Sequence, residues 1–161
     1  MIKFQEISGR DVFQYENFNL KISPGKHLII GKNFTEGNAV SNGSGKSSIP
    51  ETLDWVLFKK SSEGAGVNGM DISRDWKGGS FGDTKFFTNE HHYEIQRYGK
   101  AKGKDKSLDG AIKLFEDGED ISQRLPTHVD DEIVKLLGFD YDVATFTITV
   151  LQGLPNNFST K

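Results

Sequence analysis

The sequence predicts an α/β fold with an added antiparallel β-sheet, and three observations support this prediction. The apolar run Leu28-Ile29-Ile30 ends at Gly31 and is typical of a strand buried on both faces of a sheet. A glycine-rich stretch follows, and apolar residues then recur at helical spacing over residues 46–59. Elsewhere, alternating apolar residues indicate strands joined by short turns. Strand, loop and helix therefore stand in the order of an α/β unit.

The added sheet is predicted from two strands, two hairpins and a later helix. The strands cover residues 2–7 and 18–22, and the hairpins cover 84–98, turning near Asn89-Glu90, and 111–119. The helix opens at Pro126-Thr127, carries Val129, Ile133, Leu136 and Leu137 on its buried face, and stops at Gly138. A last strand is expected over residues 146–151. Residues 60–80 are interpreted as irregular.

Composition excludes several classes of protein. A chain of 161 residues, 35% of them hydrophobic, fits one globular domain. The formal charge of -3, from 20 basic and 23 acidic residues, excludes a strongly basic nucleic-acid coat, so any DNA contact must be local. There is no cysteine, and no run approaches the roughly 20 apolar residues of a membrane span. We therefore expect a cytoplasmic protein without membrane contact.

The glycine-rich stretch has the chemistry of a phosphate-binding loop. Phosphate oxygens require convergent backbone N–H groups without side chains in the way, which Gly43 and Gly45 provide. Lys46 would place its ammonium group between the β- and γ-phosphates, and Ser47 would give its hydroxyl group to Mg²⁺. We thus predict a P-loop NTPase that binds ATP and Mg²⁺. The candidate loop ligands are Asn42, Gly43, Ser44, Gly45, Lys46, Ser47 and Ser48.

The loop departs from the strict G-x-x-x-x-G-K-[ST] pattern. Val40 stands five residues before Gly45, where the pattern has glycine. The predicted strand already ends at Gly31, which leaves residues 32–42 as an apparent insertion. This spacing allows the loop to begin at Gly31 and to bulge outwards.

Four features together resemble the SbcC-type ATPases, relatives of the SMC chromosome proteins. They are the N-terminal pair of strands, residues 42–48 opening a helix, a hairpin ending in Tyr93-Glu94-Ile95-Gln96-Arg97, and the terminal Val150-Leu151-Gln152-Gly153. The insertion ahead of the loop resembles phage members, which are recombination endonuclease subunits. In this family an ABC-type head is divided into an N-terminal lobe, a long coiled coil and a C-terminal lobe. Residues 1–161 resemble the N-terminal lobe, without the other two parts.

The resemblance implies further roles and partners. Gln152 would be the Q-loop glutamine, a catalytic residue with Lys46 and a metal ligand with Ser47, and Arg10 would contact the nucleotide. The implied partners are the C-terminal lobe, a second head bound in the presence of nucleotide, an SbcD-type nuclease subunit and DNA. A phage protein would act in the host cytoplasm.

Two motifs that an ABC ATPase needs are absent from the sequence: a Walker B run ending in Asp-Glu and a Leu-Ser-Gly-Gly signature. The nearest imitation of Walker B, Ile112 to Asp117, has lysine inside the strand and ends in a turn signal. Without a carboxylate to position metal and water, we expect ATP hydrolysis only when a C-terminal lobe supplies these motifs.

Two other functions are compatible with parts of the sequence. A self-contained P-loop nucleotide kinase, or another small NTPase, would need its own acidic metal residue and an arginine-rich lid, and the four arginines are dispersed. A non-catalytic DNA-binding module could use Lys100, Lys102, Lys104 and Lys106, although such a loop is more often simply solvated. The four histidines do not have metal-ligand spacing.

Overall fold

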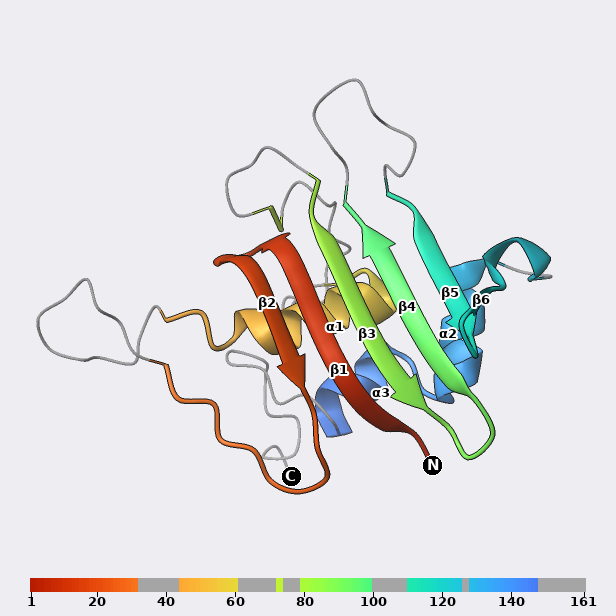
Figure 1. The fold of residues 1–161 in the computed structure, drawn as a ribbon, viewed down its shortest axis with the longest axis horizontal. Helices are drawn as coiled ribbons and strands as arrows, with labels where there is room; N and C mark the ends of the chain where they lie inside the picture. The colour runs from red at the N-terminus through yellow and green to blue at the C-terminus, as the bar shows by residue number, and fades with distance from the viewer. Residues whose placement is uncertain (32–43, 61–71, 74–78, 100–109, 126–127, 148–161) are drawn as a thin grey trace, which may run out of the picture.

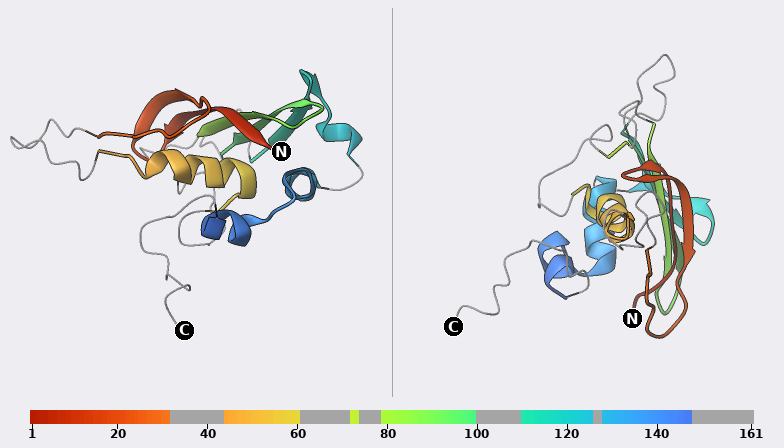
Figure 2. Two further views of the ribbon diagram at one scale, coloured as in Figure 1. Left: turned by 90° about the horizontal axis from the view of Figure 1, so that it is seen from below. Right: turned by 90° about the vertical axis from the view of Figure 1, so that its left-hand side faces the viewer.

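The structure is a computed structural model that describes residues 1–31, 44–60, 72–73, 79–99, 110–125 and 128–147. Six strands of this part form one antiparallel sheet in the order β2-β1-β3-β4-β5-β6. The α-helices lie on one face of the sheet, and the other face is open (Figures 1 and 2). The elements are β1 (Lys3–Val12), β2 (Tyr15–Lys21), α1 (Ser48–Phe58), β3 (Phe81–Phe87), β4 (His92–Tyr98), β5 (Ile112–Glu116), β6 (Glu119–Asp120), the 3₁₀ helix η1 (Ser122–Arg124), α2 (Val129–Leu137) and α3 (Tyr141–Thr147).

Most of the predicted elements are confirmed. Both predicted hairpins are present as β3–β4 and β5–β6, and the predicted helices correspond to α1 and α2. Gly138 ends α2 with a left-handed φ of 75°, as expected of a glycine stop. The strands predicted over 2–7 and 18–22 are longer than expected and pair directly as a hairpin, β1 with β2.

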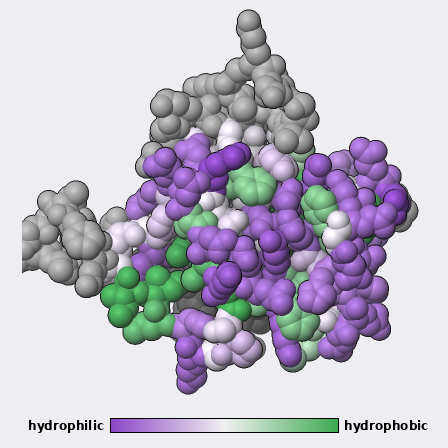
Figure 3. All heavy atoms as spheres, in the orientation of Figure 1, coloured by the Kyte–Doolittle hydropathy of each residue, from purple (hydrophilic) through white to green (hydrophobic). Residues whose placement is uncertain are grey.

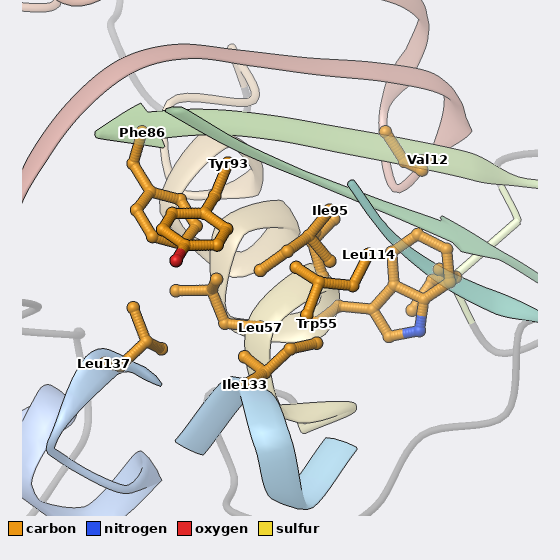
Figure 4. Packing of buried hydrophobic residues seen from close by; sticks show 11 residues of the cluster. Val12, Trp55, Leu57, Phe86, Tyr93, Ile95, Leu114, Ile133 and Leu137 are labelled. Carbon is orange, nitrogen blue, oxygen red and sulfur yellow. The ribbon is translucent and has the colours of Figure 1, made fainter. Parts of the chain in front are cut away.

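The core lies between the sheet and α1, as Figure 4 shows. Trp55 and Val56 of α1 pack against Gly82 of β3, where an added Cβ would overlap both side chains. Phe86 and Ile95, both 0% exposed, extend the core along β3 and β4. Each such large apolar side chain contributes about 1.5–3 kcal/mol when fully buried. Helix α1 is thereby fixed against the middle of the sheet.

A buried arginine joins the C-terminal end of α1 to α2. Arg97 on β4 donates a hydrogen bond of 2.9 Å from Nε to the carbonyl oxygen of Val56. Its terminal nitrogen contacts an Asp130 carboxylate oxygen at 2.5 Å, in the first turn of α2. Burial lowers the pKa of Arg97, and Asp130 opposes this shift. The guanidinium thus satisfies a carbonyl group in the last turn of α1, where the helix itself supplies no donor.

The strand predicted at Leu28-Ile29-Ile30 is wrong for the described structure. These residues form no strand and are 83%, 43% and 73% exposed. A doubly buried strand needs neighbours on both sides, whereas the described strands pair with one another in a single sheet that does not include residues 28–30. The apolar patch at the lower left of Figure 3 lies over the segment that follows β2.

The strand predicted over residues 146–151 is wrong at its start. Residues 146 and 147 close α3, because Asp140 begins that helix by accepting the N–H of Val143 at 3.0 Å. This cap outweighs the β propensity of the following residues. Residues 148–151 and the predicted lysine loop over 100–106 lie outside the described residues. None of the described helices has the length and apolar character needed to cross a membrane.

Two buried carboxyl groups lack full hydrogen bonding. Asp54 of α1 is 1% exposed, Asp83 of β3 is 5% exposed, and each has one side-chain oxygen without a hydrogen-bond partner. Burial, and secondly Glu51, raises the pKa of Asp54 to about 7. Burial, and secondly Glu94, raises the pKa of Asp83 to about 7, with Lys85 acting in the opposite direction. Both groups favour the protonated form.

These raised pKa values predict how stability depends on pH. A carboxyl group whose pKa rises from 3.8 to about 7 on folding stabilises the folded state below about pH 4, and this contribution is lost as pH rises to about 7. Asp54→Asn cannot ionise, so we expect it to be more stable than the wild type at pH 8, by up to about 4 kcal/mol. Urea unfolding from pH 4 to 8 measures this difference.

Asp131→Asn, at a solvent-accessible position of α2, is the matched control for this experiment. Equal pH slopes for wild type and Asp54→Asn would contradict the assigned role of Asp54.

Candidate functional site

The predicted phosphate loop lies at the N-terminal end of α1. Gly45 has a left-handed φ of 79°, which favours glycine. The first helical residue, Ser48, donates its N–H to the Gly45 carbonyl at 3.0 Å, and Glu51 donates to that of Ser47 at 3.1 Å. The first N–H groups of a helix and its positive dipole end together favour an anion at this position. The sequence therefore places the N-terminal end of a helix, where an anion is favoured, at the position that the motif predicted.

Two loop side chains carry the expected chemistry. The Lys46 ammonium group donates a hydrogen bond to Ser44 Oγ at 3.0 Å, so its side chain folds back over the loop. Ser47 is exposed, and its hydroxyl group does not cap α1. Ser48 is buried, and its carbonyl oxygen accepts a 2.6 Å hydrogen bond from the Thr52 hydroxyl group. The exposed Ser47 hydroxyl and the Lys46 ammonium are the groups suited to a metal ion and a phosphate.

Gly31 lies directly against the second half of the loop. A Cβ at Gly31 would overlap the Ser44 side chain and would lie 3.1 Å from Lys46 Cγ. The residues on either side of the apparent insertion are therefore in contact, although residues 32–43 separate them in sequence. A side chain larger than hydrogen at residue 31 would therefore have to displace Ser44.

The β1–β2 turn lies against Gly45, a contact that the sequence analysis did not predict. A Cβ at Gly45 would lie 3.1 Å from Gln14 Oε1 and 3.3 Å from the Tyr15 hydroxyl oxygen. The amide and the phenol therefore border the backbone that is expected to bind phosphate. The available signal was weak: polar and aromatic residues between two strands are ordinary turn residues. Only the tertiary contact identifies these two side chains.

Arg10 lies on the open face of the sheet. Its guanidinium group stands over the Phe81 ring, 5.7 Å from the ring centroid. Gly82 faces α1, and neighbouring strand residues point to opposite faces, so Phe81 and the Arg10 side chain lie on the face away from α1. A nucleotide contact by Arg10 stays a prediction.

The remaining predicted ligands lie outside the described residues. These are Asn42, Gly43 and Gln152. The described residues contain no group of three or more His, Asp or Glu side chains that could hold a metal ion by itself. The site therefore offers a hydroxyl ligand, Ser47, rather than a complete protein cage, which suits an ion that keeps waters and phosphate oxygens as ligands.

A glycine-rich loop that opens a helix, beside an added antiparallel sheet, defines the N-terminal lobe of an ABC-type P-loop NTPase. Residues 6–150 match the family described as an AAA domain, and the chain belongs to this family. This match and the relatives described next support a narrower assignment, the N-terminal lobe of an SbcC/Rad50-type ATPase.

The curated relatives are much longer than this chain. It is 29% identical over 150 residues to the "DNA double-strand break repair Rad50 ATPase" of Sulfolobus acidocaldarius, covering 92% of the chain and 15% of the relative. It is 27% identical over 142 residues to the "Probable exonuclease subunit 2" of Escherichia phage T5, covering 87% of the chain and 22% of that subunit.

Two solved structures share the fold. The first, described as "Structural biochemistry of ATP-driven dimerization and DNA stimulated activation of SMC ATPases", has a TM-score of 0.60 and 18% identity, with coverage of 98% of this chain and 91% of the other. The second is the recombination mediator protein RecF, with a TM-score of 0.54, 16% identity, and coverage of 83% and 30%. The predicted fold class is confirmed.

The contact between Gly31 and Ser44 makes a testable prediction. Gly31→Ala places a methyl group where Ser44 lies, so we expect the loop to be displaced and the affinity for Mg-ATP to fall at least about tenfold. Isothermal titration calorimetry measures the affinity. Gly110→Ala is the control: its added Cβ meets no atom within 4 Å, so even with the backbone strain expected at its φ of 67° it should leave the affinity unchanged. Equal affinities for Gly31→Ala and wild type would contradict the assigned role of Gly31.

Proposed function

We propose that this chain binds Mg-ATP as the phosphate-binding lobe of a DNA-repair or recombination ATPase. The observation that carries the proposal is the loop geometry: Gly45 takes a left-handed φ of 79° just before α1, and Gly31 lies against the Ser44 and Lys46 side chains, so glycine backbone borders the N-terminal end of the helix. A cradle of this kind fits a triphosphate, because phosphate oxygens need close access to backbone N–H groups. Membership of the AAA domain family supports the same ligand.

The loop side chains divide the binding roles. The ammonium group of Lys46, which is hydrogen-bonded to Ser44, can turn towards the β- and γ-phosphates when they bind, because its side chain is long and flexible. The Ser47 hydroxyl group would be a ligand of Mg²⁺, and Gln152 is proposed as a second one. When bound, Mg²⁺ neutralises charge that develops on the phosphate oxygens. Gln14 and Tyr15 border the same loop and are proposed to contact the nucleotide.

A C-terminal lobe is proposed to complete the head. The exposed apolar run Leu28-Ile29-Ile30 has the composition of a buried strand but has no cover in the described structure. A strand from a second lobe, placed beside this run, would bury it next to the phosphate loop. The same lobe would bring the Walker B carboxylates and the signature motif that this sequence lacks. Hydrolysis by the chain alone is therefore expected to be slow or absent.

The proposed partners follow from the relatives. The names of a Rad50 ATPase and of a phage exonuclease subunit point to DNA ends and a nuclease partner of the SbcD type. The SMC structure is described as one of ATP-driven dimerization, and we propose that two completed heads likewise associate around two nucleotides. In this scheme head closure regulates the nuclease in the cytoplasm, which is the host cytoplasm for a phage protein.

The test compares Mg-ATP turnover by the chain alone, by the chain with the C-terminal lobe added, and by the same mixture with Lys46→Ala. We expect turnover only with both lobes, and a loss of at least about 100-fold in the variant, because the lysine stabilises charge in the transition state. A steady-state phosphate-release assay measures it.

Exposed Lys135 provides the matched control, because Lys135→Ala removes a lysine of α2, which lies apart from the phosphate loop. Brisk turnover by the chain alone, or phosphoryl transfer from ATP to a nucleotide, would replace this proposal with a self-contained small NTPase or kinase.

A further inference from the structure

The β1–β2 turn adopts an unfavourable backbone. Asp11 and Phe13 have φ values of 50° and 48°, in the left-handed region that side chains other than those of Asn and Asp rarely adopt. Aspartate tolerates this region, whereas Phe13 costs on the order of 1 kcal/mol there and persists only where the surroundings hold it. Strain of this kind is expected where a turn is held in one position.

The surroundings that hold this turn come from a distant segment. The Ser73 hydroxyl group donates a hydrogen bond of 2.6 Å to Asp11 Oδ2, across 62 residues of sequence. The Phe13 N–H donates one of 2.5 Å to the Ile72 carbonyl oxygen. Ile72 is 1% exposed and Ser73 is 4% exposed, so each bond has one buried partner. Loss of a bond leaves that buried polar group without this partner, which is costly.

The far side of the same turn reaches the phosphate loop. Gln14 and Tyr15 follow Phe13 directly and lie against Gly45. Val12, the residue before Phe13, is 0% exposed and belongs to the core cluster, and this packing restricts movement of the turn. A continuous set of contacts thus runs from Ser73 through Asp11 and the turn to the loop.

We propose that Asp11 and Ser73 are positioning residues for nucleotide binding. Their hydrogen bond, together with the bond from Phe13 to Ile72, holds the strained turn so that Gln14 and Tyr15 stay against Gly45. The inference rests on the proposed binding of Mg-ATP and adds residues that are not part of the phosphate loop itself. Ile72 and Ser73, which lie between α1 and β3 in the sequence, thereby acquire a role in the affinity for nucleotide.

The experiment measures the Kd for Mg-ATP by isothermal titration calorimetry, using the 161-residue chain. Ser73→Ala removes the donor, so we expect Kd to rise roughly tenfold, the effect of losing one partly buried hydrogen bond. Asp11→Asn keeps an acceptor oxygen and tolerates the left-handed backbone, and it should stay within about twofold of wild type. Ser122→Ala is the control, because it removes a Ser–Asp bond of 2.7 Å to Asp120 at the far edge of the sheet.

A second readout separates positioning from general stability. In a variant that carries both Gln14→Ala and Tyr15→Ala, the side chains that join the turn to Gly45 are absent. Adding Ser73→Ala to this variant should therefore change Kd by less than about twofold. A double-mutant cycle measures this dependence of one substitution on the others. An unchanged Kd for Ser73→Ala in the wild-type background overturns the inference, as does an equal loss in both backgrounds. Wild-type binding that is absent, or that survives Lys46→Ala, instead overturns the proposed function.

Discussion

Helix α1 can lie close against the sheet because Gly82 has no side chain. Any larger residue there would displace Trp55 and Val56, which fill the centre of the core. The position of α1 in turn sets the position of the loop at its N-terminal end. At its other end, Arg97 ties the helix to β4 and to the first turn of α2. The close approach at Gly82 and the bonds of Arg97 together therefore hold α1, whose N-terminal end is expected to bind phosphate.

The sequence was most informative where structure is local. The hairpins, α1 and the glycine stop of α2 depend on residues within a few positions of one another, and these were predicted correctly. The phosphate loop was predicted from its glycine spacing and from the strand and helix expected on either side, and its assignment as a ligand site stays a prediction. The structure adds that Gly31 and Ser44 are in contact, a fact that no spacing rule contains.

Sequence reasoning failed where distant residues decide. Gln14 and Tyr15 are unremarkable turn residues until Gly45 is placed beside them, and Ser73 is one polar residue in an irregular stretch until Asp11 accepts its hydrogen bond. Asp54 is a similar case, since a carboxylate at a helical position is normally solvated, whereas here α1 carries it into an apolar environment. The strand predicted at residues 28–30 is wrong for a related reason. Its apolar pattern requires neighbouring strands or helices that bury it, and the described residues do not supply them.

The exposed run Leu28-Ile29-Ile30 also bears on how such a protein is made. In the Rad50 relative from Sulfolobus acidocaldarius, the segment that matches this chain is 15% of the polypeptide. If the strand that covers the run comes from a later part of a chain, the run stays exposed while the ribosome completes the rest. Uncovered β-prone apolar segments are starting points for misassembly between nascent chains. Charged and polar neighbours on both sides, Lys26-His27 and Lys32-Asn33, are gatekeepers of the kind that limit this hazard.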